Sequence, residues 1–467
     1  MRTGQEHLCA ALERLPREDA DHLASQLREV DLDLIARLVD RLVRTAGPRT
    51  LGEVTPADAA DFIRLPETAD DEQREQDARH AGRRMLSEGR VAAVLLAGGQ
   101  GSRLGFPGPK GDFPFLPITR RTLFWQHCTT IAALRTRYGA PLPLYILTSP
   151  TNDAETRAIF AANAHYGLPP ESVRFVVQGT LPAVDACSGA LLREEPDRLA
   201  LSPDGHGGLL NALRRAGALD EMVDADIETL FTYQVDNPLV RCCRPEFLGH
   251  HALAEADMSS VVVRKLSPEE RMGVIAHVDG LPGVVEYSDL PDELAGARTA
   301  DGELVFWAGS IAVHCIQLRF AQRLTDGSLT LMHHRALKRV EHVDDADRPV
   351  VPDEPNAVKF ETFLFDALAH ARRTIAVEAR REEEFAPIKN ADGADSPESA
   401  RRAVNRRNAA WIEAGGGRVR RDESGEPVDV EIDPRYALDA EELQRRLPRG
   451  VTIDEPTVID ADFAPAV

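Results

Sequence analysis

The stretch from Val91 to Gly111 restricts the fold of this chain more than any other part of the sequence. Its first residues, Val91 to Ala97, form an apolar run that suits one buried strand of a parallel sheet. Glycines then follow at positions where the backbone must approach another group closely, namely Gly98, Gly99, Gly101 and Gly105. Two cations, Arg103 and Lys110, lie in this part, and Thr122 to Arg135 is typical of a helix. A strand, a cationic glycine loop and a helix together predict a phosphate site.

The spacing excludes the two commonest glycine loops. A dinucleotide-binding loop needs glycine three residues after Gly101, where this chain has Leu104. A P-loop needs Gly-Lys-Ser/Thr, but Lys110 follows Pro109 and precedes Gly111. The loop therefore belongs to a different class of phosphate site.

Beyond this loop, apolar runs alternate with helical segments up to about Thr374, which predicts α/β layers. The predicted strands are Val91–Ala97, Leu144–Thr148, Val173–Val177, Thr229–Val235, Ser260–Val263 and Leu304–Trp307. Further helices are predicted at Asp153–Ala164 and Gly208–Ala216. Residues 1–88 are predicted to be a helical appendage, with a helix start at Thr55-Pro56-Ala57-Asp58. After Gly415-Gly416-Gly417, a small, β-rich C-terminal region is predicted.

The amino-acid composition of the chain indicates which partners and which cellular compartment to expect. The chain carries 76 acidic and 55 basic residues among 467, a formal charge of −21, which argues against a nucleic-acid partner. Its six cysteines include no C-x-x-C pair, which fits a reducing cytosol. We see no signal-peptide pattern and no apolar run of about eighteen residues, so we expect a cytoplasmic protein without a membrane span.

Some charged and histidine-containing segments are predicted to lie at the surface of the protein and not in a functional site. The run Glu378 to Glu384 is predicted to be a solvated helix end. The pairs His250-His251 and His333-His334 lack nearby supporting ligands, so we expect them at the surface.

Asp236 and Asn237 follow the predicted strand Thr229–Val235, where α/β sheets present groups to ligands. Mg²⁺ prefers carboxylate oxygen together with substrate phosphates and water, so Asp236 suits a metal ligand and Asn237 a ribose or sugar hydroxyl. Taken alone, an Asp-Asn pair would more often be a helix cap or turn.

Five motifs in one order give the chain a family resemblance. They are LAGGQGSRLG with PKG, QGTLP from Gln178, PDGHGG from Pro203, VDN from Val235, and FAPIKNAD from Phe385. Together they resemble the signature of the UDP-sugar pyrophosphorylases, most closely the eukaryotic-type UDP-N-acetylhexosamine pyrophosphorylases. The likeness extends from about Ser87 to Trp411. It implies a three-layer nucleotide-diphospho-sugar transferase (Rossmann-like) core over residues 89–411, between the 1–88 appendage and the 412–467 region.

The resemblance also implies roles for individual residues. Lys110 and Arg103 would bind the departing pyrophosphate, and Lys389 the phosphate of the sugar. Gln178 would read the uracil edge, for which an amide offers both a donor and an acceptor. Asp236 and Asp392 would hold Mg²⁺. The remaining substrate-binding positions implied are Leu96, Ala97, Gly98, Gly99, Gly205, His206, Asn237, Gly273, Glu286, Ser310 and Phe363.

Two of these positions depart from the family pattern. His206 replaces an asparagine and resembles the glucose-using relatives, and Ser310 replaces an asparagine that touches the sugar. Both departures concern the identity of the sugar, for which N-acetylglucosamine ranks first by a narrow margin.

We therefore expect a uridylyltransferase that makes a UDP-sugar and pyrophosphate from UTP and a sugar 1-phosphate. One alternative is a glucose-1-phosphate or other hexose-1-phosphate uridylyltransferase. A glycosyltransferase of the same architecture would usually carry a D-x-D pair, which VDN lacks. A non-catalytic nucleotide-sugar-binding protein would not need Arg103, Lys110 and Lys389. The sequence leaves the oligomeric state open.

Overall fold

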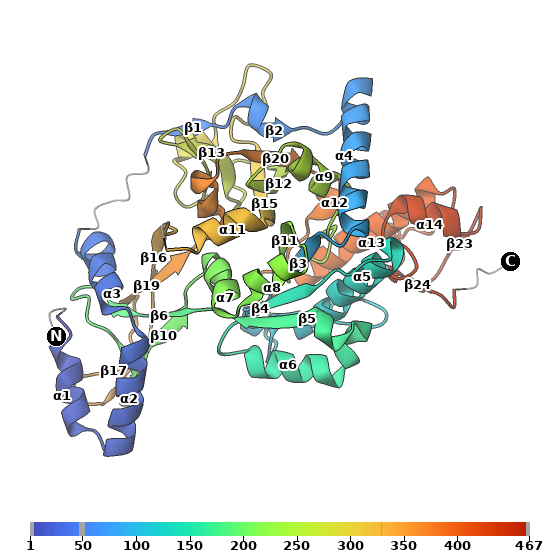
Figure 1. Ribbon diagram of the computed structural model, residues 1–467. Coiled ribbons are helices and arrows are strands. Elements are labelled where there is room, and N and C mark those ends of the chain that lie inside the picture. Colours follow the sequence, from blue (N-terminus) through green and yellow to red (C-terminus); the bar gives the residue numbers. More distant parts are fainter. Residues whose placement is uncertain (1–3, 46–51, 328, 464–467) are drawn as a thin grey trace.

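The computed structural model describes residues 4–45, 52–327 and 329–463, and an eleven-stranded sheet forms its centre (Figure 1). The main strands lie in the order β2 (Phe62–Ile63), β20 (Thr374–Glu378), β12 (Met258–Arg264), β15 (Ala308–Gln317), β11 (Thr229–Gln234), β3 (Val91–Leu96), β4 (Leu144–Thr148) and β5 (Val173–Val177). β15 is antiparallel to its neighbours β11 and β12, whereas the other adjacent pairs are parallel. β1 (Val54–Pro56), β13 (Val274–Val278) and β14 (Leu281–Val285) extend the sheet beside β15.

Helices cover both faces of this sheet, so the core has three layers. Alternate residues of β3 point to opposite faces: Val91, Ala93 and Leu95 belong to one hydrophobic cluster and Ala92, Val94 and Leu96 to another. On the first face lie α4 (Ala69–Ser87), α5 (Leu123–Tyr138), α9 (Pro245–Leu253) and α13 (Pro397–Ala414). On the second face lie α7 (Leu209–Arg215), α8 (Ala218–Asp224) and α11 (Leu318–Leu324). The predicted α/β architecture is confirmed, as are the predicted strands that became β3, β4, β5, β11 and β12.

The N-terminal part is only partly helical. Helices α1 (Glu6–Arg14), α2 (Arg17–Glu29) and α3 (Leu32–Val39) pack on a separate sheet of β16 (His333–Lys338), β19 (Ala357–Thr362) and β7 (Val184–Asp185). The predicted helix start at Thr55-Pro56 is wrong, because both residues lie in β1. β2 then joins the edge of the central sheet through pairing with β20. The next helix, α4, instead begins after Thr68, whose side chain accepts from the Asp71 backbone N–H.

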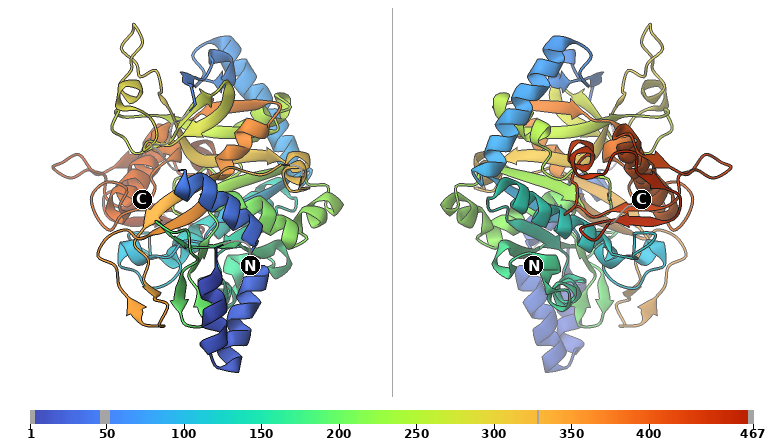
Figure 2. Two further views of the ribbon diagram at one scale, coloured as in Figure 1. Left: turned by 90° about the vertical axis from the view of Figure 1, so that its left-hand side faces the viewer. Right: turned by 90° about the vertical axis from the view of Figure 1, so that its right-hand side faces the viewer.

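The C-terminal part adds a small mixed unit. α14 (Ala440–Arg446) lies beside two parallel pairs, β21 (Arg418–Val419) with β23 (Thr452–Ile453) and β22 (Val430–Ile432) with β24 (Thr457–Ile459). Its hydrophobic cluster includes Trp411 and Ile412 at the end of α13. Helix α1 and strand β24 lie on opposite sides of the molecule (Figures 1 and 2).

The remaining elements are short and connect the layers. They are α6 (Asp153–Ala162), α10 (Asp292–Ala295), α12 (Arg381–Glu384), β6 (Thr180–Pro182), β8 (Arg193–Glu195), β9 (Arg198–Leu199), β10 (Leu201–Pro203), β17 (His342–Val343) and β18 (Pro349–Val350). No helix in the described ranges is long and apolar enough to cross a bilayer.

Besides the helix start at Thr55-Pro56, three sequence-based predictions about segments are wrong. Leu304–Trp307 is not a strand: Leu304 makes one isolated bridge, and β15 begins at Ala308. His250 and His251 are buried in α9, where they contact Glu75 (2.8 Å) and Ser259 (2.7 Å). Glu378 and Glu384, at the ends of the charged run, are also buried and bind arginines.

Candidate functional site

The predicted site residues gather where the parallel strands end. Gly98 follows β3, Gln178 follows β5 and Asp236 follows β11, all at the same edge of the sheet. Leu96 and Ala97 are buried at the end of β3, with the Leu96 carbonyl accepting from Val235 N–H (3.1 Å). This edge is the place where α/β sheets bind ligands.

The glycine loop folds back on itself as a narrow hairpin. Gln100 and Pro109 form an antiparallel bridge, and the Lys110 N–H donates to the Gly99 carbonyl (3.1 Å). Gly105 has a φ of 66°, which the turn requires and which glycine adopts without steric cost. Gly99 is exposed and has open space beside its Cα, so the backbone there can approach a ligand closely.

Asn152 holds this loop and was missed by the sequence analysis. It is fully buried, and its Nδ2 donates to the Ala97 carbonyl (2.9 Å) and, at 3.4 Å, to the Gly99 carbonyl. Its Oδ1 accepts from Ser149 N–H (2.8 Å). The available signal was its place four residues after the strand Leu144–Thr148, on the connection that leaves the carboxyl end of that strand.

Lys110 and Asp236 form an ion pair at the centre of the site. Lys110 Nζ lies 3.2 Å from Asp236 Oδ2 and donates to the Ile388 carbonyl at the same distance. Both side chains are partly accessible, with 15% and 19% of their surface exposed. A ligand can therefore reach both charges, and the Ile388 contact brings the FAPIKNAD segment to the glycine loop.

The side chain of Asn237 binds protein backbone, whereas the sequence predicted a contact to a ribose or sugar hydroxyl. Its side chain is buried, with Nδ2 donating to the Glu384 carbonyl (2.7 Å) and Oδ1 accepting from Ala386 N–H (3.1 Å). The amide thus ties the end of β11 to the segment after α12.

Gln178 connects two of the predicted substrate-binding positions, Gly98 and Gly205. Its Nε2 donates to the Gly205 carbonyl (2.6 Å), and its Oε1 lies next to Gly98. Asp204 fills the neighbouring space, since a Cβ on Gly208 would lie 2.1 Å from its Oδ1. Burial raises the pKa of Asp204, and a hydrogen bond from Gln178 opposes that rise. Asp204 is not among the residues that the sequence predicts for the site.

The contacts of His206 explain why a histidine fits at this position. Its Nδ1 accepts from Leu364 N–H (3.1 Å), and its ring stacks on Phe363 with centroids 5.3 Å apart. Burial lowers the pKa of His206 to about 4, so the ring is neutral at pH 7. Phe363 also packs against His334 (4.5 Å), whose Nε2 lies 2.7 Å from Asp366 Oδ2.

Three of the predicted substrate-binding residues, Gly273, Glu286 and Ser310, also lie together. The Ser310 N–H donates to the Gly273 carbonyl (2.8 Å), and a Cβ on Gly273 would lie 3.3 Å from Glu286 Oε1. Near Ser310, the pairing of β15 with β12 is interrupted by a register shift, and Ala312 has a φ of 56°. Such bulges and strained residues are common beside active sites.

Glu286 borders both Lys389 and a large cavity. Burial and the nearby Asp289 carboxylate raise the pKa of Glu286, and Lys389 and His334 oppose this rise. The cavity has a volume of about 940 Å³ and lies between α3, β14 and the segment around His334. The sugar end of the candidate site therefore has free space beside it.

The two remaining predicted cations and the second carboxylate are exposed. Arg103 and Asp392 make no ion pair or hydrogen bond through their side chains within the described residues, and Lys389 Nζ lies 5.9 Å from the Phe385 ring. Asp392 thus has no contact that brings it to Asp236 in this structure.

The donor set fits a magnesium ion held largely by the substrate. Mg²⁺ usually takes one or two carboxylates and completes its shell with phosphate and water oxygens, and Asp236 offers one accessible carboxylate. The described residues also contain a cluster of Asp58, Asp61 and His277, which includes none of the predicted site residues.

This chain is similar to known proteins over most of its length. A family model described as UTP–glucose-1-phosphate uridylyltransferase matches residues 51–412. The human UDP-N-acetylhexosamine pyrophosphorylase-like protein 1 is 34% identical over 496 residues, which cover 99% of this chain and 96% of that protein. The UDP-N-acetylglucosamine pyrophosphorylase of Saccharomyces cerevisiae is 30% identical over 456 residues, 95% of this chain and 94% of its own length.

Solved structures show the same similarity. The uridine diphosphate N-acetylglucosamine pyrophosphorylase from Trypanosoma brucei, crystallised in complex with inhibitor, superimposes with a TM-score of 0.80 at 25% identity. The match covers 99% of this chain and 97% of that one. A UDP-glucose phosphorylase from the same organism has a TM-score of 0.61 at 16% identity, which shows a shared fold.

Proposed function

Since this chain belongs to the UTP–glucose-1-phosphate uridylyltransferase family, we propose that it transfers the uridylyl group of UTP to N-acetylglucosamine 1-phosphate. The products are the UDP-sugar and pyrophosphate. The observation that carries this proposal is the meeting of the glycine hairpin, the Lys110–Asp236 pair and Gln178 at one edge of the sheet. The names of the relatives at 30% and 34% identity favour N-acetylglucosamine 1-phosphate as the acceptor.

The reaction asks the protein for positioning and charge rather than covalent chemistry. A phosphate oxygen of the sugar 1-phosphate attacks the α-phosphorus of UTP, and the bond to the bridging α–β oxygen breaks. Lys110 and Arg103 neutralise the departing pyrophosphate, and Lys389 holds the attacking phosphate. Gln178 pairs with the uracil edge, and Glu286 and Gly273 contact the sugar. Holding both phosphates in line supplies much of the rate enhancement.

Asp236 is the proposed protein ligand of Mg²⁺, which would neutralise phosphate charge when bound. Asp392, which is exposed, remains a second candidate ligand. Substituting Asp236→Asn keeps the size of the side chain and removes its charge, so the Mg²⁺ concentration for half-maximal activity should rise. Full activity of this variant at low Mg²⁺ would show that other groups hold the metal.

A panel of sugar 1-phosphates with UTP, scored by pyrophosphate release, tests the proposal. We expect the highest kcat/KM with N-acetylglucosamine 1-phosphate and much poorer use of ATP, because the wrong base leaves buried polar groups unpaired. Preference for glucose 1-phosphate would favour the glucose branch. If the protein binds a UDP-sugar but releases no pyrophosphate from UTP with any of the sugar 1-phosphates, it is a binding protein.

A further inference from the structure

Glu384 is a buried acid at the end of α12, two residues after the exposed Glu382. Only 2% of its surface is exposed. One carboxylate oxygen lies 3.2 Å from Arg244 Nη1, and the other accepts from Arg241 N–H (3.3 Å). Burying an ion pair costs desolvation energy on both sides, so this arrangement needs an explanation other than general stability.

The backbone of the same residue is tied to the candidate site. The Glu384 carbonyl accepts from Asn237 Nδ2 (2.7 Å), and Asn237 Oδ1 accepts from Ala386 N–H (3.1 Å). Two residues further on, Ile388 N–H donates to the Asp236 carbonyl (2.8 Å). The segment that ends in Lys389 is therefore fixed directly against the end of β11. We call Glu384, Asn237, Arg241 and Arg244 the Glu384 clasp.

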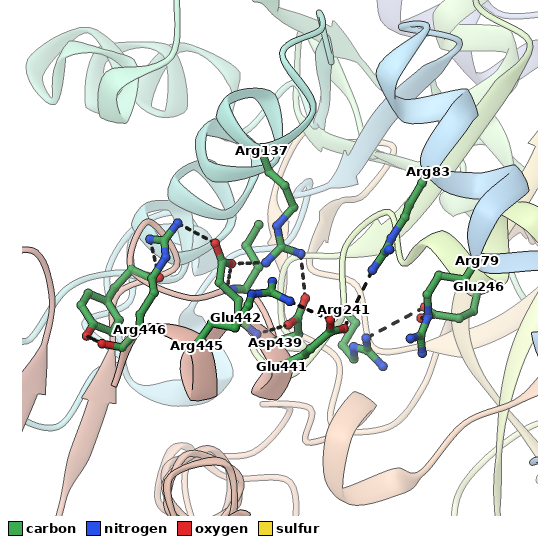
Figure 3. Close-up of polar contacts among 12 residues, drawn as sticks. Arg79, Arg83, Arg137, Arg241, Glu246, Asp439, Glu441, Glu442, Arg445 and Arg446 are labelled. Carbon is green, nitrogen blue, oxygen red and sulfur yellow. Dashed lines mark hydrogen bonds and ion pairs between the residues drawn. The ribbon is translucent and has the colours of Figure 1, made fainter. Parts of the chain in front are cut away.

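Residues from distant parts of the chain support the clasp from outside. Arg241 Nη2 lies 4.0 Å from Glu246 of α9, and Arg79 of α4 donates to the same carboxylate (2.6 Å; Figure 3). Arg137 of α5 binds Asp439 (2.7 Å) in front of α14, close to Arg241 (Figure 3). Arg241 thus lies where α4, α9 and the C-terminal region meet.

We propose that Glu384 is a positioning residue that sets the place of Lys389 relative to the Lys110–Asp236 pair. The inference rests on the proposed function, in which Lys389 holds the phosphate of the sugar. Glu384 does not touch the substrate. It fixes the first residues of the segment through Arg244 and Asn237, so that the Lys389 ammonium lies where the attacking phosphate must be. A misplacement of about 1 Å at such a group can lower turnover about a hundredfold.

A double-mutant cycle tests this role. Glu384→Gln should lower kcat/KM for the sugar 1-phosphate about tenfold or more, while UTP affinity stays near native. In that background, adding Lys389→Ala should cost much less than it costs in the native chain, because both changes remove one contribution. Glu382→Gln, on the same helix but exposed, is the matched control and should leave kcat/KM unchanged. Additive losses in the cycle would overturn the proposal.

A second variant separates positioning from stability. Glu384→Gln leaves the Arg244 guanidinium buried without its carboxylate, so Glu384→Gln/Arg244→Gln is measured beside it. We expect the pair variant to regain thermal stability and to keep the low kcat/KM. Recovery of activity together with stability would show that the ion pair serves only the fold.

Hydrogen exchange gives a readout that does not need turnover. The amides of residues 386 and 388–390 should exchange faster in Glu384→Gln than in the native chain or in Glu382→Gln. Unchanged exchange in this segment would also overturn the clasp. Native turnover of Lys389→Ala, in contrast, would contradict the role of Lys389 in the proposed function, and the exchange rates would then decide the clasp alone.

Discussion

Lys110 is the residue whose loss separates chemistry from folding most clearly. Its ammonium binds Asp236 and the Ile388 carbonyl, and 15% of the side chain is accessible. Lys110→Ala should lower kcat at least about a hundredfold, the scale of one lost transition-state contact. Thermal unfolding should stay near native. Lys338→Ala, exposed on β16, is the control, and a turnover of Lys110→Ala equal to it would remove Lys110 from the mechanism.

Ser310 decides a finer question, the choice of sugar. It lies next to Gly273 at the interrupted pairing of β15 with β12, where a longer amide can reach toward the space beside Glu286. Ser310→Asn should raise kcat/KM for N-acetylglucosamine 1-phosphate relative to glucose 1-phosphate. The ratio is measured by pyrophosphate release with both acceptors in parallel. A shift toward glucose 1-phosphate would mean that Ser310 does not face the sugar.

At the scale of residues, spacing along the chain predicted which positions meet but not what each side chain does. Gly98, Gln178 and Asp236 come together because they follow β3, β5 and β11, parallel strands that end at the same edge of the sheet. Asn237 has the same position in the pattern, yet its amide holds backbone from residues 384 and 386. Such long-range contacts leave no local periodicity in the sequence. The same reason explains why the burial of Glu384 could not be predicted.

At the scale of elements, α4 and α9 pack closely together through glycines on both helices. A Cβ on Gly249 would lie 1.7 Å from the Ala78 carbonyl oxygen, and one on Gly82 would lie 1.9 Å from the Pro245 carbonyl oxygen. Gly249→Ala should therefore lower the free energy of unfolding by about 2 kcal/mol or more, because backbone must move apart. Urea unfolding measures the loss. Gly283→Ala, which meets no atom within 4 Å, should change stability little; equal effects would refute the close helix contact.

Elements with strong local signals were predictable, and those defined by distant partners were not. β3, with its apolar run, and α5, with its capping Thr122, were both identified from the sequence. β2 has only two residues and exists because β20 lies beside it. Thr55 and Pro56 look like a helix start locally, but pairing with β13 makes them a strand.

At the scale of the whole molecule, buried histidines link stability to pH. Burial lowers the pKa of His127, His206 and His251 to about 4 and that of His314 to about 3. In the unfolded chain these groups titrate near 6.5, so below that pH the unfolded state binds protons that the folded state refuses. The contribution of these histidines to the free energy of unfolding should therefore be at its maximum above pH 6.5 and decrease steadily toward pH 4.

Unfolding midpoints measured from pH 7.5 to pH 4.5 check this dependence. His206→Asn isolates one contribution, since the asparagine Oδ1 can still accept from Leu364 N–H and has no proton to gain. Its midpoint should fall less steeply with acid than that of the native chain. Identical slopes would show that His206 is not held neutral by burial.

The pairing of β2 with β20 also affects folding during synthesis, because it joins Phe62 to Ala376, which is made much later. A ribosome adds about 5 to 20 residues per second, so β2 waits about 15 to 60 seconds for its partner to be made. The Arg137 contacts to Asp439 and Glu442 form later still. Nascent chains stalled before residue 374 should be cut by protease near β2, whereas the finished protein should resist cleavage there. β2 therefore stays without its partner strand until most of the chain has been synthesised.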